Sequence, residues 1–436
     1  MFKPWSICHV DLSAPLAAIP ADPSWGGVVL VYWYKGIPLG RRDVQISQLP
    51  LSIARLCQMA LKDIAPAVAD RLFDRGFCAP LPERRPQPDA PPDFKALQRL
   101  RRPLEKVTLR LQQTSNDVSK ETFAVIICTR ERPDALHACL VAVQALDPAP
   151  NEVIVVDNAP RSGATRAVVR AFPDVRYVVE PAPGLSRARN TGLRHTQAAL
   201  VAFTDDDALV HPNWLGRLWG AFAAPDVVAA TGLILPARLD TPAQVLFEQS
   251  HGVSGWGFRT LDFDHAFFER MRRFGVPAWR IGAGANMAFR RVVFEDLGGF
   301  DERLGAGASG CSEDSEMWYR ILARGGVCRY EPAAVVHHIH RREMEHLRHQ
   351  MFQYMRGHLA ALLVQFEKHG HVGNLRRALI TLPGYYGKSV LRRVLGRSAG
   401  PILLGAQIRG CAAGLSYYFR YRTAAPGAPG CKPIHA

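Results

Sequence analysis

The chain has 436 residues, of which 48% are hydrophobic and 21% are charged. This length predicts two or three domains, and the composition excludes a disordered chain. The net charge of +15 is unevenly placed, because residues 341–436 hold 15 Lys and Arg against three acids. A basic end suggests an anionic surface, such as lipid headgroups, nucleic acid or an acidic polymer, and a merely solvated basic face explains it equally well.

Cysteine use and the apolar segments bear on the compartment. The nine cysteines have irregular spacings and no CxxC pair. Four lie inside or beside apolar segments and indicate buried thiols in a reducing compartment: Cys128, Cys139, Cys311 and Cys328. No secretory signal is visible, and the segment 402–419 falls short of the ~20 apolar residues of a membrane span. We expect a cytoplasmic location, with the basic end as the part that would contact the inner face of the cytoplasmic membrane.

Residues 1–77 are predicted to form an accessory α+β region. The run GVVLVYWY at 27–34 is typical of a buried strand, and residues 49–72 have helical spacing. The sequence does not indicate their function. A Pro-rich stretch, 78–94, and a basic stretch that reaches 116 predict a linker over 78–120, because the Pro-rich composition cannot pack a core.

Residues 121–345 alternate short apolar runs with helical patterns. Strands are predicted at 123–128, 152–156, 175–179 and 200–203, with helices at 136–146, 164–172 and 186–197. This alternation predicts an α/β fold with a mostly parallel sheet flanked by helices. The strands end at Thr129, Asp157 and Asp205–Asp207. Because functional residues of such sheets gather at the carboxyl ends of the strands, we expect the site there.

The C-terminal quarter is predicted to be helical and basic. Residues 346–423 read as a basic extension of several short helices broken by Gly and Pro, and 424–436 as a flexible tail. Its mixture of aromatic, aliphatic and basic residues, as in Tyr417-Tyr418-Phe419-Arg420, suits a helix at a membrane interface. Packing of these helices onto the catalytic region is the alternative.

The most informative motif is FTDDDA at 203–208. Three carboxylates follow an apolar strand, and such crowding raises the electrostatic energy unless a cation is bound. Hard divalent ions such as Mg²⁺ and Mn²⁺ prefer oxygen ligands and often bridge to substrate phosphates. The alternative, equally favoured by the triplet alone, is a turn or helix cap built with Asp.

Three further segments carry polar residues whose isolated patterns remain ambiguous. GLSRARNTG at 184–192 suits a diphosphate, although an ordinary amphipathic helix explains it better when it is taken alone. Ser312 is a candidate N-cap for a helix whose first turn holds Glu313 and Asp314, where favourable capping charge is the stronger isolated explanation. In HHIH at 337–340, His338 and His340 would share one face of a strand as candidate metal ligands, or simply end it.

Taken in order, these segments resemble the family 2 glycosyltransferases, which have the GT-A fold. The resemblance covers residues 123–341 and rests on the series rather than on one motif. The series runs FAVIICTRERP, EVIVVDNAP, GLSRARNTG, FTDDDA, GAGANMAFRR, GGFDERLGAG, SEDSEMWYRI and VVHHIH.

The resemblance implies a role for each matching position. Thr129, Arg130 and Asp157 match the positions that hold the nucleotide base and ribose. Gly184, Arg189 and Asn190 match the loop near the donor. Asp205 and Asp207 match the first and third residues of a DXD motif that binds Mn²⁺ or Mg²⁺ and the donor diphosphate, and Asp206 matches a residue facing the ribose or sugar. The remaining matches are Gly284 and Asn286 in a turn lining the donor sugar and acceptor, Asp314 as catalytic base with Glu313 beside it, His338 near the metal, and His340 less securely.

The implied reaction is inverting transfer from a UDP, GDP or dTDP type sugar to a glycan or lipid-linked acceptor, in cell-envelope polysaccharide or glycolipid synthesis. Asp314, with an ordinary pKa of about 4, would take the hydroxyl proton late in the attack. A nucleotidyltransferase is an alternative, disfavoured because no Gly-rich loop with a trailing Lys follows the first strand. A non-catalytic protein that binds sugar nucleotides or nucleic acid is another, disfavoured by the intact acidic residues and by the lack of a nucleic-acid module. The donor sugar, the acceptor and the oligomeric state are not readable.

Overall fold

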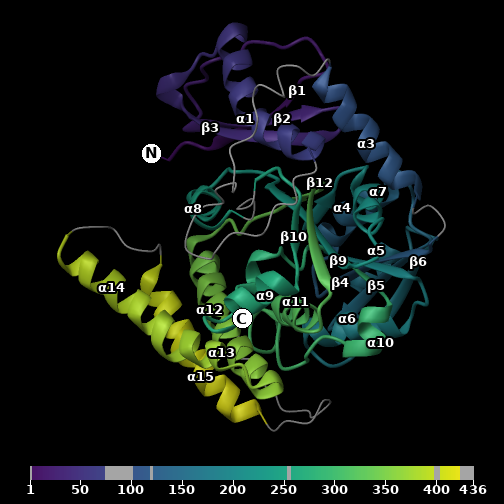
Figure 1. Ribbon diagram of the computed structural model, residues 1–436, viewed down its shortest axis with the longest axis vertical. Helices are drawn as coiled ribbons and strands as arrows, with labels where there is room; N and C mark the ends of the chain where they lie inside the picture. Colours follow the sequence, from purple (N-terminus) through teal and green to yellow (C-terminus); the bar gives the residue numbers. More distant parts are fainter. Residues whose placement is uncertain (1, 74–101, 118–120, 253–256, 397–402, 423–436) are drawn as a thin grey trace.

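The computed structural model describes residues 2–73, 102–117, 121–252, 257–396 and 403–422 (Figure 1). An N-terminal unit lies at the top of the view and the C-terminal helices lie at the lower left, with a larger α/β unit between them. The predicted flexible tail, 424–436, falls outside the described residues.

The N-terminal unit is a three-stranded sheet covered by a helix. Strand β2 (Gly27–Tyr34) pairs in parallel with β1 (Trp5–Asp11) and antiparallel with β3 (Ile37–Gln45), and the short 3₁₀ turn η1 (Ile46–Gln48) leads to α1 (Ile53–Phe73). Alternate residues of β2 point to opposite faces, so one set packs under α1 and the other set packs against the α/β unit. Burial on both faces explains the unbroken apolar run, and the predicted strand at 27–34 is confirmed.

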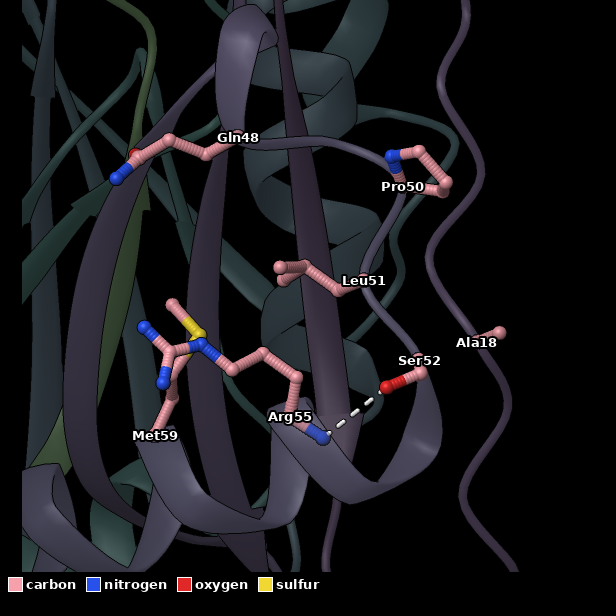
Figure 2. Close-up of a pocket in the computed structure, with 7 residues that line it drawn as sticks. All are labelled: Ala18, Gln48, Pro50, Leu51, Ser52, Arg55 and Met59. Atoms are coloured by element: carbon pink, nitrogen blue, oxygen red, sulfur yellow. Dashed lines mark hydrogen bonds between the residues drawn. The ribbon is translucent and has the colours of Figure 1, made fainter.

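The N-terminal unit also carries an open hollow with a volume of about 580 Å³ (Figure 2). Its wall is formed by Ala18, Gln48, Pro50, Leu51, Ser52, and Arg55 and Met59 of α1. The Ser52 hydroxyl accepts a hydrogen bond from the backbone N–H of Arg55 at 3.3 Å, so Ser52 helps to cap α1. The wall contains no residue of the α/β unit, which leaves the hollow outside the site predicted at the strand ends.

Helix α3 (Pro103–Asp117) lies within the predicted linker. Its side chains Leu104, Val107 and Leu111 join the core of the N-terminal unit, and the helix also contacts α7 (Trp214–Ala221). The structure therefore differs from the prediction here, because apolar residues spaced three and four apart give this stretch a face to bury. The other linker residues, 78–101 and 118–120, lie outside the described part of the chain.

The α/β unit is built on one nine-stranded sheet in the order β10-β12-β9-β11-β7-β4-β5-β6, with β8 paired to β12. The neighbours β6, β5, β4 and β7 are parallel, as predicted, and β11 runs antiparallel to both β7 and β9. The other half of the sheet is therefore mixed. The strands are β4 (Phe123–Thr129), β5 (Glu152–Asn158), β6 (Val175–Glu180), β7 (Leu200–Asp205), β8 (Ala208–Val210), β9 (Val227–Pro236), β10 (Leu261–Phe263), β11 (Asn286–Arg290) and β12 (Val327–His338).

Helices cover both faces of this sheet. Along β4 the side chains alternate, so that Ile126 faces one hydrophobic cluster while Val125 and Ile127 face the other. The first cluster includes residues of α6 (Leu185–Arg194), α9 (His265–Arg272), η2 (Ala278–Arg280), α10 (Val292–Leu297) and α11 (Glu313–Ala323). The second includes residues of α4 (Pro133–Gln144), α5 (Ala164–Val169) and α7, while α8 (Pro242–His251) contacts α12.

The C-terminal region begins with one helix of 26 residues, α12 (Met344–His369), where short broken helices were expected. Gly357 lies inside this helix and does not break it. A methyl group at Gly357 would meet the backbone oxygen of Cys311 at 2.5 Å, so glycine allows α12 to approach Cys311 closely. Shorter helices follow: α13 (Val372–Arg376), the π-helix η3 (Arg377–Thr381), α14 (Leu382–Val394) and α15 (Leu404–Tyr421). Helices α12 and α15 pack together, and α12 contacts α11, so part of the extension packs onto the α/β unit.

Two further sequence predictions concern thiols and membrane spans. All seven cysteines in the described residues are free, with Cys128, Cys139 and Cys328 buried and Cys311 partly buried. Among the helices of the described residues, none has both the length and the apolarity that a bilayer crossing requires.

Candidate functional site

The strand ends named in the sequence come together at one edge of the sheet. Thr129 pairs in register with Asp157 across β4 and β5, and Cys128 pairs with Asp205 across β4 and β7. The chain then turns through Asp206 and Asp207 into β8. The parallel half of the sheet thus aligns the carboxyl ends as the βαβ pattern predicts.

A pair of carboxylates and an imidazole form a candidate cation site. Strand β8 pairs antiparallel with β12, which places His338 opposite Ala208 and brings its Nε2 to 3.2 Å from Asp207 Oδ1. One ligand atom each from Asp205, Asp207 and His338 lie within 4.8 Å of one another. Ligands on opposite sides of a Mg²⁺ ion lie about 4.2 Å apart, so this donor set fits a small divalent cation.

The three aspartates have different surroundings. Burial raises the pKa of Asp205, an effect that Arg189 only partly offsets. Asp207 is also buried, but His338, Arg132 and Arg341 hold its pKa well below the ordinary value. Burial raises the pKa of Asp206 to about 7. The three carboxyl groups therefore differ in their pKa values, and the ionised form is most strongly favoured at Asp207.

Asp206 and Thr129, which were expected near the sugar and the nucleotide, bond to each other in the structure. Asp206 is fully buried, its Oδ2 accepts a hydrogen bond of 2.6 Å from the Thr129 hydroxyl, and its Oδ1 pairs with Arg132. These contacts join β4 to the turn after β7 and fix that turn, whose next residue is Asp207.

Two arginines at this edge were missed in the sequence. Arg132 Nη1 donates to Asp207 Oδ2 at 2.6 Å, and Arg341 Nη1 lies 3.6 Å from the same oxygen. Arg132 follows the predicted strand 123–128 within the TRERP segment, so its place just beyond a strand end was the available signal. Arg341 follows the HHIH motif and carried no such signal.

Arg189 connects the two halves of the site. This guanidinium on α6 is only 2% exposed; it pairs with Glu313 Oε1 and lies 3.5 Å from Asp205 Oδ1. Its Nη2 also donates to the Gly284 carbonyl at 3.3 Å. A methyl group on Gly284 would meet this Nη2 at 2.6 Å, so a larger residue there would displace the guanidinium from its present position. Arg189 and Glu313, expected beside the donor and the base, are thus buried supports.

Asp314 lies at the start of α11, where backbone donors hold its carboxylate. Oδ2 accepts from the Gly284 N–H at 2.8 Å, and Oδ1 accepts from the Ser315 N–H at 2.6 Å and from the Ser315 hydroxyl at 3.1 Å. Burial raises the pKa of Asp314 above its ordinary value, which contradicts the expected value of about 4. A carboxylate with a raised pKa accepts a proton more readily once it is ionised.

The cap expected before α11 also differs. Ser312 precedes the helix, but its side chain makes no capping hydrogen bond and its φ is +74°. A non-glycine residue in this left-handed region costs roughly 1–2 kcal/mol. The strained backbone lies next to Glu313 and Asp314, where it sets the direction in which α11 begins.

Four other predicted residues have clear positions. Asp157 is buried at the end of β5, where the Tyr177 hydroxyl donates to its Oδ2 at 2.7 Å, and Arg130 is partly buried just after β4. The Gly184 N–H donates to Asn158 Oδ1 at 2.9 Å, which anchors the start of α6. The Asn190 amide bonds the backbone N–H and carbonyl of Phe300, so it holds that loop.

Asn286 begins β11 opposite Thr204, the residue before Asp205, and its side chain is directed into the protein interior. It is fully buried in β11, its Nδ2 donates to the Leu233 and Ala334 carbonyls, and its Oδ1 accepts from the Trp214 indole. All these bonds are internal, and the role expected for Asn286 beside the donor sugar and acceptor stays a prediction. Asn286 ties β11 to the neighbouring strands.

The late histidines also separate. His338 ends β12 at the cation site, whereas His340 lies beyond the strand and its Nε2 is 2.8 Å from Glu248 Oε2. His340 therefore belongs to the surroundings of the site and not to the candidate ligands.

Residues 124–298 match the family described as Glycosyl transferase family 2. This stretch contains β4 to α10 and so includes Asp205, Asp207, Arg189 and Gly284. The chain carries a family 2 glycosyltransferase domain. The α/β sheet described above agrees with the GT-A fold implied by this family.

Several curated glycosyltransferases resemble this domain. The pre-mycofactocin glycosyltransferase of Mycobacterium tuberculosis is 28% identical over 52% of this chain and 44% of its own length. The glucosyl-dolichyl phosphate glucuronosyltransferase of Haloferax volcanii is 28% identical over 42% of this chain and 56% of its own. The succinoglycan biosynthesis protein ExoM of Rhizobium meliloti is 28% identical over 48% and 64%. The chain thus spans about half the length of these relatives.

Among solved structures, the mannosyltransferase PcManGT from Pyrobaculum calidifontis, in complex with GDP-Man and Mn²⁺, is 20% identical to this chain with a TM-score of 0.44. The similarity covers 72% of this chain and 89% of that one.

Proposed function

We propose that this protein is a metal-dependent inverting glycosyltransferase that moves a sugar from a nucleoside-diphosphate sugar to an acceptor hydroxyl. The observation that carries the proposal is the single buried network around Arg189. Arg189 contacts Asp205, a candidate cation ligand; Glu313, which precedes the candidate base; and the turn at Gly284. One side chain thereby sets the spacing between the cation site and Asp314. A transferase needs this spacing, because the leaving diphosphate and the attacking hydroxyl lie on opposite sides of the anomeric carbon.

The residues that would hold the cation are Asp205, Asp207 and His338. Two carboxylates and one imidazole suit Mn²⁺ or Mg²⁺. When bound there, the cation would supply neutralisation of the charge that develops on the departing diphosphate.

The chain's own residues then have separate tasks. Asp314 takes the proton of the acceptor hydroxyl as its oxygen attacks the anomeric carbon, and the configuration inverts. The N–H groups of Gly284 and Ser315 hold the carboxylate in one orientation. Asp157, Arg130 and Gly184 lie near the ends of β5, β4 and β6, and we propose that they contact the nucleotide.

The donor nucleotide is of the UDP, GDP or dTDP type, and the acceptor is a glycan or a lipid-linked glycan. The support is the set of relatives, whose names concern succinoglycan biosynthesis, O-antigen biosynthesis and a glucosyl-dolichyl phosphate acceptor. We propose a role in cell-envelope polysaccharide or glycolipid synthesis on the cytoplasmic side of the membrane.

Removal of divalent cations is expected to abolish sugar transfer. Excess EDTA should reduce the release of nucleoside diphosphate to background, and Mn²⁺ or Mg²⁺ should restore it, because Asp205 and Asp207 alone add negative charge beside the diphosphate. Coupled assays of nucleoside diphosphate measure this directly. Full activity in excess chelator would remove the metal role from these residues.

Helix α14 supports a further part of the proposal, which is binding to an anionic membrane surface. Val390, Leu391 and Val394 of this helix are exposed, as is Ile380 in the preceding π-helix η3, while Tyr386 of α14 is buried. Residues 368–436 contain eleven Lys and Arg and no Asp or Glu. Each basic residue near an anionic bilayer contributes about 1 kcal/mol, and the exposed apolar side chains can enter the interface.

Vesicle co-sedimentation tests this membrane contact. The protein should sediment with vesicles that contain phosphatidylglycerol, and L391E with V394E should weaken that binding. Val292→Glu, an exposed apolar residue on α10, is the matched control and should bind like the parent protein. Absence of binding to anionic vesicles, or equal loss in the control, would remove the membrane contact.

A further inference from the structure

A line of buried polar contacts runs from the N-terminal unit to the candidate cation site. Arg41, on β3, pairs through Nη1 with Glu248 Oε1 on α8. Glu248 Oε2 lies 2.8 Å from His340 Nε2, and His340 Nδ1 lies 3.4 Å from His338 Nδ1. His338 Nε2 then faces Asp207 at 3.2 Å. The four side chains span two units of the fold and end on a cation ligand.

This line is shielded from water. The side chains of Glu248 and His340 are each 2% exposed, and that of Arg41 is 13% exposed. Burial by itself would raise the pKa of Glu248, but the His340 hydrogen bond and the charge of Arg41 hold that pKa below its ordinary value. A buried carboxylate without such partners would be costly, so Arg41 is what keeps a negative charge beside His340.

With a cation bound between Asp207 and His338, the contacts are consistent with the following placement of protons. An ionised Glu248 can only accept, so His340 carries its proton on Nε2 and leaves Nδ1 as an acceptor. His338 then carries its proton on Nδ1, which donates to His340 and leaves the Nε2 lone pair directed at Asp207 and the cation site. Hydrogen bonds to the second ring nitrogen commonly fix both the tautomer and the orientation of a ligating histidine.

The N-terminal unit is held rigidly enough to serve in this way. Its Arg71 pairs with Glu331 at 2.7 Å, and Glu331 belongs to β12, the strand that ends at His338. Val29, Val31 and Trp33 of β2 pack on Leu233 and Val335 of β9 and β12. Arg41 is thus presented from a docked sheet and not from a loose extension.

We propose that Arg41, Glu248 and His340 are positioning residues for the cation site, and that the N-terminal unit thereby completes the site by fixing His338 as a ligand through Nε2. The inference rests on the cation site proposed above. It gives the accessory region, to which the sequence assigned no function, a part in metal binding.

Titration of Mn²⁺ alone tests this, with free Mn²⁺ measured by electron paramagnetic resonance. Arg41→Met, Glu248→Gln and His340→Phe are each expected to raise the Mn²⁺ dissociation constant by about 10–100-fold, the usual effect of removing a partner of a metal ligand. Arg41→Lys should recover most of the affinity, because it restores a cation next to Glu248.

Arg42→Met is the matched control. Arg42 neighbours Arg41 and pairs with Asp63 inside the N-terminal unit, through Nε at 2.6 Å, without contact to the Glu248 line. Its Mn²⁺ affinity should equal that of the unchanged protein. Should Arg41→Met fail to fold, Glu248→Gln, which keeps the shape of the side chain, decides the question.

The outcomes distinguish a failure of the positioning role from a failure of the cation site itself. Unchanged Mn²⁺ affinity in Arg41→Met and Glu248→Gln, or an equal loss in Arg42→Met, would overturn the positioning role while leaving the cation site intact. No Mn²⁺ binding by the unchanged protein would overturn the cation site itself, and the positioning role with it.

Discussion

Replacing Asp314 by Asn is expected to lower kcat by about 10²–10⁴-fold, the usual contribution of a general base, and to change the KM for the nucleotide sugar little. Asn has nearly the same shape and keeps an oxygen that can accept from the Gly284 or Ser315 N–H. It cannot take up the proton of the acceptor hydroxyl. Initial rates at varied donor concentration measure kcat and KM, and calorimetry with the nucleotide sugar measures donor binding.

Ser315→Ala provides the control for this substitution. It removes only the hydroxyl that donates to Asp314 Oδ1 at 3.1 Å and keeps both the carboxylate and the Ser315 N–H. We expect a much smaller loss of kcat than in Asp314→Asn. Near-full activity of Asp314→Asn would show that Asp314 is not the base.

The second large effect is expected on stability. Arg189→Met should lower the free energy of unfolding by about 3–5 kcal/mol, because it leaves Glu313 buried without its cationic partner. The same change removes the contact to Asp205 and the bond to the Gly284 carbonyl, so transfer activity should fall as well. Urea unfolding followed by circular dichroism gives the free energy.

Arg187→Met, on the same helix, is the comparison. Arg187 is partly exposed and lies 3.4 Å from Glu302, a pair in which each side chain is more than 20% exposed. Such pairs contribute about 1 kcal/mol or less. If Arg189→Met and Arg187→Met cost the same, the buried network does not support the site as described.

Much of the fold could be predicted because its strands have periodic or continuous apolar runs with polar ends. The strands at 123–128 and 27–34 were recognisable from composition alone, and both are present as β4 and β2. The antiparallel β11 was not predicted, since its residues follow a Gly-rich turn that was read only as a turn. Helix α3 was not predicted because it follows a Pro-rich stretch that was interpreted as a linker. The length of α12 was not predicted because Gly357, which allows close packing, was interpreted as a helix breaker.

The site was predictable at the level of the motif and less so at the level of each side chain. Asp205, Asp207 and His338 meet because β7 ends at Asp205 and the pairing of β8 with β12 brings His338 beside Asp207. Whether a polar side chain points outward or bonds inward depends on tertiary partners. The Asp206 carboxylate bonds Thr129 and Arg132, and the Asn286 amide donates to backbone carbonyls. No local sequence pattern specifies these partners.

The central claim is tested most directly by identifying the phosphorus product formed from a panel of UDP, GDP and dTDP sugars, using ³¹P nuclear magnetic resonance in the presence of Mg²⁺. We predict that at least one donor yields its nucleoside diphosphate with the unchanged protein, and that Asp314→Asn yields almost none. Release of pyrophosphate would identify a nucleotidyltransferase instead. No cleavage of any donor, or equal cleavage by Asp314→Asn, would contradict an inverting transferase that uses Asp314 as its base.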